Sequence, residues 1–344
     1  MTFGTAVFAI IAAAAGAIPG GVAFVPRIVS EHAISLRDAS DVRWVDADHV
    51  LVTDTYNGIV RLSLSGSDVV SLPEWPHPNG PGTSYTCLAI SGDTVVVGDF
   101  AFSFRWRERG KTALHREFQE FIADLDLDGD RILLSGLRRD SDGKMGQDGA
   151  FAWIGSLRGG ERSLRPVLPF RDMGSIENCA SFGLGAVRFL SNGSFMVVPG
   201  AEGGIYLYDK SAKLQRVWQT DPLGIDTDCE MSREQQSALG PNVVARQQWV
   251  NRRRIVDEIL DTPAGPALIA RKVTPAGTHW DLILLASDGS VSERSLPFES
   301  SSPWAHVAAA TRANRAVFVI ADRVPPSVKR TAPPRLILAE WPQR

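Results

Sequence analysis

Many strand-like segments of this 344-residue chain alternate apolar and polar residues with the period of two that is typical of β-strands. The alternating segments recur as a unit: an apolar strand, a polar turn, a second β-rich strand, a variable loop, and a third strand rich in aromatic residues. In the first unit the turn Asp46–His49 is followed by the strands Val50–Thr53 and Ile59–Leu62. The pattern predicts an all-β fold built from repeated small sheets.

Six such units follow one another, roughly every 40 to 70 residues, which is the spacing of β-propeller blades with variable loops. Their turns are Asp46–His49, Ser91–Thr94, Asp128–Arg131, Ser191–Ser194, Pro263–Pro266 and Arg312–Arg315. Fourth strands are recognisable after several units, at Asp68–Leu72, Leu214–Trp218 and Val291–Leu296. We therefore predict a six-bladed β-propeller with four-stranded blades.

The two ends of the chain complete this pattern. The sixth unit reaches its third strand at Arg335–Trp341 and then lacks a fourth, whereas the strand-like stretch Arg27–Leu36 precedes the first unit and has no partner of its own. Placing Arg27–Leu36 at the outer edge of the sixth sheet closes the ring and removes the exposed edges. Two stacked β-sandwiches, or seven blades, are the alternatives that the pattern leaves open.

The arrangement resembles six-bladed propellers of the NHL, TolB and gluconolactonase type over 27–341. The resemblance is one of architecture, carried by strand–turn–strand units such as Val45–Val50. It includes no family-specific motif and implies the fold, while function has to be argued from a site.

The N-terminal residues differ from the rest of the chain. No charged side chain occurs from Thr2 to Pro26, and Ala6–Ile18 is a continuous apolar run. Such a run is typical of a signal peptide, although the usual basic leader is missing. We predict that residues 1–25 are a signal peptide or a hydrophobic anchor, that 26–344 form one propeller domain, and that the protein is extracytoplasmic, either periplasmic or secreted. A buried strand or helix is the alternative.

Long loops are predicted on one face only, the face on which each second strand turns into the third. They are Arg138–Asp148, Arg171–Phe182, Asp221–Arg254, Val273–His279 and Arg323–Pro334. Loops on a rigid scaffold carry most binding residues, so this long-loop face is the expected binding face. In its largest insertion, residues 221–254, Ser232 and Gln235 form a capping box that predicts a short helix ending at Gly240-Pro241.

The candidate ligand contacts on that face are aromatic and cationic. They are Trp249, Arg252, Arg253, Arg254, Trp304 and His306. Arginines at a channel mouth bind carboxylates or phosphates through a planar fork of N–H donors. Pairing of the arginines with acids of the same insertion, and a structural role for Trp304 and His306, are the alternatives.

The three cysteines show no C-x-x-C spacing, which argues against a zinc ribbon. Cys179 and Cys229 flank the fourth blade on the long-loop face, and we predict a disulfide between them in an exported protein. Cys87 lies at the start of a predicted inner strand and is expected to be a buried small residue.

Catalytic and metal-binding motifs do not stand out. The segment Asp124–Gly129 imitates a calcium loop, but Ser135 occupies the position where an EF-hand needs glutamate. We predict no cofactor, leave a divalent cation open, and expect no nucleic-acid partner, because the net charge is −3. The expected function is a non-catalytic binding or scaffold protein that recognises a protein or small ligand. The alternatives are a subunit of a larger surface assembly and a metal-dependent lactonase that uses Asp41, Glu120 and Asn178.

Overall fold

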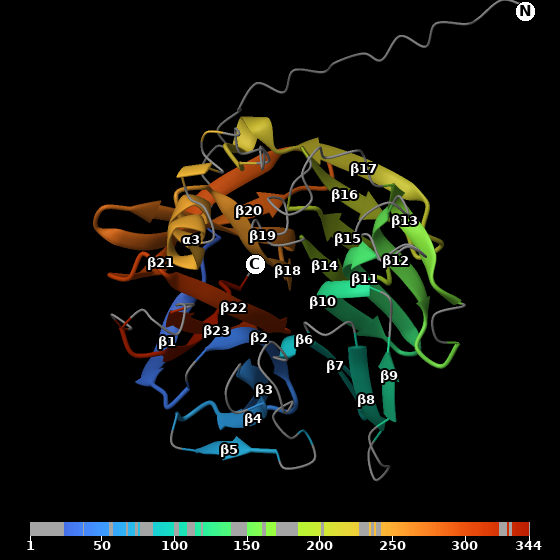
Figure 1. Cartoon of the computed structure of the whole chain (residues 1–344), viewed down its shortest axis with the longest axis horizontal. Helices are drawn as coiled ribbons and strands as arrows, with labels where there is room; N and C mark the ends of the chain where they lie inside the picture. The colour runs from blue at the N-terminus through green and yellow to red at the C-terminus, as the bar shows by residue number, and fades with distance from the viewer. Residues whose placement is uncertain are drawn as a thin grey trace, which may run out of the picture.

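The computed structural model is an all-β propeller built from four-stranded antiparallel sheets (Figure 1). It describes residues 24–36, 38–54, 58–66, 68–72, 75, 85–99, 103–108, 114–117, 120–138, 150–159, 163–169, 185–200, 203–226, 234, 237–238, 242–322, 329 and 332–343. The described strands form six sheets, and in five of them the order in space follows the order in the sequence.

The first three sheets come from the N-terminal half of the chain. They consist of β2 (Ala39–Trp44), β3 (His49–Asp54), β4 (Gly58–Ser63) and β5 (Val69–Ser71); β6 (Tyr85–Ser91), β7 (Thr94–Asp99), β8 (Ser103–Glu108) and β9 (Leu114–Glu117); and β10 (Glu120–Asp128), β11 (Arg131–Arg138), β12 (Ala150–Ser156) and β13 (Arg165–Pro169). The fourth strands β9 and β13 were not among those that the sequence pattern identified.

The remaining sheets include both ends of the described chain. They consist of β14 (Ala186–Phe189), β15 (Phe195–Val198), β16 (Gly204–Tyr208) and β17 (Leu214–Gln219); β18 (Ile255–Thr262), β19 (Gly265–Thr274), β20 (Gly277–Leu285) and β21 (Val291–Ser300); and β22 (Ala305–Arg312), β23 (Arg315–Asp322), β24 (Arg335–Glu340) and β1 (Arg27–Ala33). The antiparallel pairing of β1 with β24 is the one that the sequence predicted.

The polar turns predicted from the sequence all connect the first and second strands of a sheet. Two-residue turns join β6 to β7, β10 to β11, β18 to β19, and β22 to β23. Each sheet begins with an innermost strand, and these strands contact one another in the order β2, β6, β10, β14, β18, β22 and back to β2. Figure 1 shows them around the centre of the molecule.

The core lies between neighbouring sheets. Leu133 and Phe151 of one sheet pack with Val187 and Phe195 of the next, and all four side chains are buried. A second cluster joins Trp280 and Phe318 of consecutive sheets through Phe298, whose ring lies 4.8 Å from that of Phe318. Apolar burial between sheets is the main force that holds such a repeat fold together.

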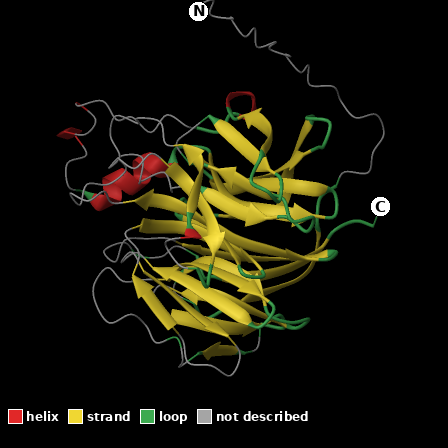
Figure 2. Ribbon diagram, turned by 90° about the vertical axis from the view of Figure 1, so that its right-hand side faces the viewer, coloured by secondary structure: helices red, strands yellow, loops and turns green. Residues whose placement is uncertain are grey.

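The described residues Glu234, Ser237 and Ala238 of the insertion 221–254 are helical, as predicted, and a second helix follows them. Helix α3 (Val243–Asn251) begins after Pro241, and the Asn242 side chain caps it by accepting a hydrogen bond from the Ala245 amide at 3.1 Å. Helix α3 was not itself predicted from the sequence. The predicted capping residue Ser232 lies outside the described residues. In Figure 2 the α-helix lies on the left of the molecule and the C-terminus on the right.

One of the predicted long loops is a tight turn. Strands β19 and β20 pair up to Thr274 and Gly277, so only two residues separate them. Residues 273–279 therefore belong to an extended hairpin. Gly277 permits the tight turn, because it adopts the left-handed φ of 134° that the turn needs.

Candidate functional site

The predicted ligand residues of the insertion contact one another and nearby acids. The Arg253 guanidinium lies over the Trp249 ring at 4.8 Å and 3.6 Å from an Asp226 carboxylate oxygen. Trp249 is partly buried against the core, and Arg252, at the end of α3, is exposed. The pairing with Asp226 is the alternative that the sequence left open for Arg253.

Arg254 is held by four groups of the fold. Its guanidinium donates to Asp281 at 2.9 Å, to Glu293 at 2.8 Å and to the Leu223 carbonyl oxygen, while its backbone amide donates to Asp226. These contacts tie the insertion to the sheet of β20 and β21, so Arg254 has a structural role.

Trp304 and His306 are buried near the start of β22. His306 Nδ1 lies 3.3 Å from Asp257, which also accepts a hydrogen bond from Trp280 at 2.9 Å. Burial raises the pKa of Asp257, but Arg271 and His306 outweigh it and hold that pKa at about 2. The cluster joins β18, β19, β20 and β22 and fits the structural alternative for His306.

The predicted disulfide cannot be compared with this structure. Cys179 and Cys229 lie outside the described residues, as do most of 138–148, 171–182 and 323–334. Cys87 is a free, buried thiol, as expected, and burial raises its pKa. The Cys179–Cys229 disulfide therefore stays a prediction.

The structure contains a cavity of about 430 Å³. It lies at the end of the innermost strands that is opposite to the long-loop face. Its lining includes residues from the final part of every one of these strands, among them Arg43 of β2, Ile90 of β6, Asp126 of β10 and Arg188 of β14. We call it the central cavity. It reaches the short-turn end, where its lining residues Asp128, Ser191 and Ala313 are exposed.

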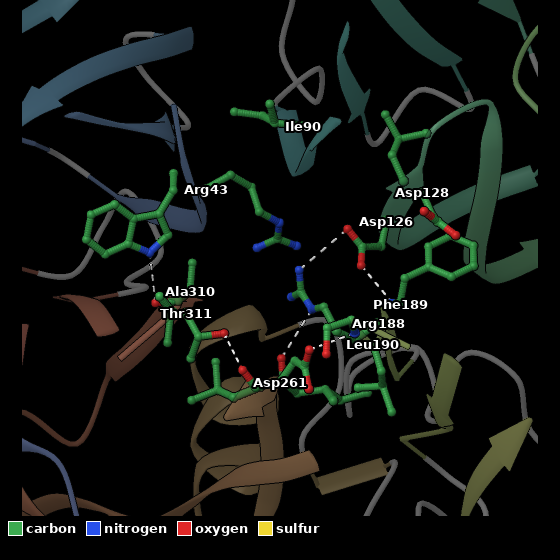
Figure 3. Close-up of a pocket in the computed structure, with 17 residues that line it drawn as sticks. Arg43, Ile90, Asp126, Asp128, Arg188, Phe189, Leu190, Asp261, Ala310 and Thr311 are labelled. Carbon is green, nitrogen blue, oxygen red and sulfur yellow. Dashed lines mark hydrogen bonds and ion pairs between the residues drawn. The ribbon is translucent and has the colours of Figure 1, made fainter. Parts of the chain in front are cut away.

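Two arginines extend into the central cavity and point toward each other (Figure 3). Arg43 donates through Nη1 to Asp41 and to the Val42 carbonyl oxygen. Arg188 donates to Glu258 at 3.0 Å and to the Ile259 carbonyl oxygen at 3.2 Å, and it lies 3.7 Å from Asp126. Both arginines are nine-tenths buried or more.

Acidic side chains beside the arginines connect neighbouring sheets. Asp41 accepts a hydrogen bond from the Leu88 amide, and Asp124 and Asp126 accept from the amides of Val187 and Phe189, at 2.7 to 2.8 Å. Innermost strands of different sheets do not pair as a ladder, so these carboxylates satisfy buried N–H groups that need a partner.

β-Bulges set the position of three of the acids. The pairing register shifts immediately before Asp41 in β2, before Asp124 in β10 and before Glu258 in β18. A bulge re-aims the side chains that follow it, which is one reason why bulges occur beside functional sites. The repeated bulge places the acids at one level around the centre.

Burial changes the protonation of this cluster. Burial raises the pKa of Asp41 to about 7, although Arg43 lowers it, and burial also raises the pKa values of Asp124 and Glu258. Burial lowers the pKa of Arg188, but Asp126 and Glu258 outweigh this and raise it above its usual value. Arg188 therefore stays charged, while Asp41 binds a proton near neutral pH.

Sequence reasoning missed this site. Asp124–Gly129 looked like an imitation of a calcium loop, and the structure places Asp124 and Asp126 in β10 instead, with their oxygens on backbone amides. Among the described residues, no group of three or more His, Cys, Asp or Glu is arranged to hold a metal ion. Of the residues suggested for a lactonase metal, Asp41 contacts Arg43, Asn178 lies outside the described residues, and the Glu120 side chain is not described.

Solved structures that are similar to this chain support its assignment as a β-propeller. A member of the DUF4221 family from Bacteroides vulgatus has a TM-score of 0.57 at 10% identity and covers 92% of this chain and 97% of its own. The WD40 repeats of RRP9 have a TM-score of 0.53 at 9% identity and cover 92% and 99%. Virginiamycin B lyase from Staphylococcus aureus has a TM-score of 0.50 at 14% identity and covers 90% and 98%.

These likenesses show the fold alone, because all three identities are far below those at which function is shared. No family model matches the chain, and no curated protein matches it in sequence. None of the helices in the part of the chain that the structure describes is both long and apolar enough to cross a membrane.

Proposed function

We propose that this protein is a non-catalytic binding propeller that holds a small ligand in the central cavity. The observation that carries the proposal is the cavity itself, which has the size of small-molecule sites and combines apolar walls with a few converging polar groups. Ile90 and Leu260 belong to its apolar lining, and Arg43 and Arg188 to its polar lining.

This location differs from the long-loop face favoured by the sequence. There, Arg253 and Arg254 are engaged by acids of the fold, whereas the central cavity leaves space between charged side chains (Figure 3). Binding of a protein partner through the long-loop face is compatible with ligand binding at the other end, and WD40 propellers are similar in fold.

The cavity predicts binding of a small uncharged aromatic probe. Benzamide is expected to bind with a dissociation constant on the order of millimolar, as measured by saturation-transfer NMR. Replacing Ile90 with tryptophan puts an indole ring into the cavity and is expected to weaken the signal. Val70→Trp is the matched control, because Val70 is exposed on β5 and does not line the cavity. Equal binding to both variants would contradict the assignment of the site.

We also infer that the sheets form one closed ring of six blades, with β1 as the outer strand of the last blade. Two observations support it: β1 pairs with β24, and the central cavity takes lining residues from all innermost strands. A ring of this kind leaves short, protected sheet edges.

Export and a disulfide complete the proposal. The apolar run before residue 25 motivates export, and export makes a Cys179–Cys229 bridge favourable. Intact protein recovered from the periplasm or medium is expected to gain the mass of two hydrogens on reduction, with Cys87 remaining a thiol. Trapping of all three cysteines by alkylation without reduction, in unfolded protein, would exclude the bridge.

A further inference from the structure

Arg43 presents two buried N–H donors that have no acceptor. Its Nε and Nη2 atoms make no hydrogen bond, while Nη1 donates to Asp41 and Val42. Nε and Nη2 lie on the same edge of a guanidinium and form the side-on fork that holds two oxygens of one carboxylate or phosphate. Leaving such donors buried and unpaired is costly, so this edge is suited to an acceptor from outside the protein.

The acids of the cavity lining already have donors. Asp126 accepts from the Phe189 amide, Asp261 from the Ser191 amide at 2.7 Å, and Asp128 from Arg131 at 2.9 Å. Arg188 in turn donates to Glu258 and Ile259. Each of these acids thus has at least one donor, whereas Nε and Nη2 of Arg43 have no acceptor, so this edge of the cavity favours an anion over a cation.

The charged groups around the Nε–Nη2 edge of Arg43 determine how anion binding depends on pH. Asp124 lies 3.9 Å from Arg43 Nη2, too far for a hydrogen bond, and each of its oxygens accepts from a backbone amide. Asp41 lies beside Arg43 on β2, Asp126 and Asp128 line the cavity from β10, and Arg188 and Glu258 face the cluster from β14 and β18. Burial raises the pKa values of Asp41, Asp124 and Glu258, and their protonation removes repulsion, so an anion is expected to bind more tightly as the pH falls.

We propose that the central cavity binds an organic oxyanion, a carboxylate or a phosphate monoester, with its head group on the side-on edge of Arg43 and its apolar body against Ile90. The inference rests on the proposed function and adds the ligand class to it. Arg188 faces Arg43 across the cavity and adds a second positive charge near the head group (Figure 3).

Matched probes separate this inference from the proposed function. Benzoate and phenyl phosphate are titrated beside neutral benzamide by saturation-transfer NMR or calorimetry, at about neutral pH. At least one of the anions is expected to bind about tenfold more tightly than benzamide. The stronger of the two identifies carboxylate or phosphate as the preferred head group. Equal binding of all three probes would overturn the oxyanion inference and leave the cavity proposal standing, and no binding of any probe would overturn both.

Variants of Arg43 test the fork directly. Arg43→Lys keeps the positive charge but has no side-on edge, so the ratio of anion affinity to benzamide affinity is expected to fall about tenfold. Arg61→Met removes an exposed arginine of β4 and is the control. An undiminished preference in Arg43→Lys would overturn the role of the fork. The wild-type comparison of probes decides the ligand class even when a variant unfolds.

Discussion

Replacing Arg188 with methionine is expected to lower the free energy of unfolding by about 3–5 kcal/mol. Arg188 is the cation to which Glu258 and Asp126 are directed, and both carboxyl groups are buried. Methionine fills part of the volume but leaves these acids without a counter-charge. Chemical denaturation followed by tryptophan fluorescence measures the loss.

The size of this loss is expected to depend on pH. Without Arg188, the pKa of Glu258 in the folded protein rises further above its unfolded value. An acid with a raised pKa binds more protons in the folded state than in the unfolded one, so stability falls as the pH rises. The variant is therefore expected to be closest to wild type at about pH 5 and to lose most at about pH 8.

Two further variants complete this test. Arg27→Met breaks an exposed pair with Glu340 and is expected to cost less than about 1 kcal/mol at either pH. The double variant Arg188→Met with Glu258→Met removes a buried pair together and is expected to recover much of the loss. A small, pH-independent effect of Arg188→Met would show that this pair does not hold β14 to β18.

The strands were predictable because their signal is local. The apolar run Val50–Val52 is buried on both faces of β3, as a short apolar run predicts, and dipeptides such as Gly92-Asp93 mark the two-residue turns. Strands β9 and β13 escaped prediction because they are short outer strands, and outer strands require fewer buried residues than the central ones.

The central cavity was not predictable from spacing along the chain. Arg188 and Glu258 are 70 residues apart, and only the contact of β14 with β18 brings them to 3.0 Å. The position of Asp41 and Asp124 depends on β-bulges, which the alternation of Asp and Leu does not reveal. The signal available in the sequence was the presence of charged residues inside otherwise apolar inner strands. Charged side chains are rarely buried unless they are paired or functional.

Deleting β1 is expected to abolish cooperative unfolding, whereas deleting residues 1–23 alone is expected to leave it intact. Strand β1 is the second partner of β24, whose Leu336, Ile337 and Ala339 are fully buried. Without β1 the backbone edge of β24 is exposed, and an exposed edge promotes aggregation. Thermal melts and size-exclusion chromatography of the two truncated chains measure the difference.

A circular permutation turns this into a test of ring closure. Arg27 is paired with Glu340 in register, and the Phe24 ring stacks on Trp341 at 5.3 Å, so the start of β1 lies beside the end of β24. A chain that begins at Asp38 and carries residues 24–37 after Arg344 can form the same pair as a hairpin. It is expected to melt cooperatively within a few degrees of the chain that lacks residues 1–23, because the same strands close the same ring. A permuted chain as unstable as the β1 deletion would mean that β1 acts through its connection to β2, and a β1 deletion as stable as its control would mean that the last blade does not need a fourth strand.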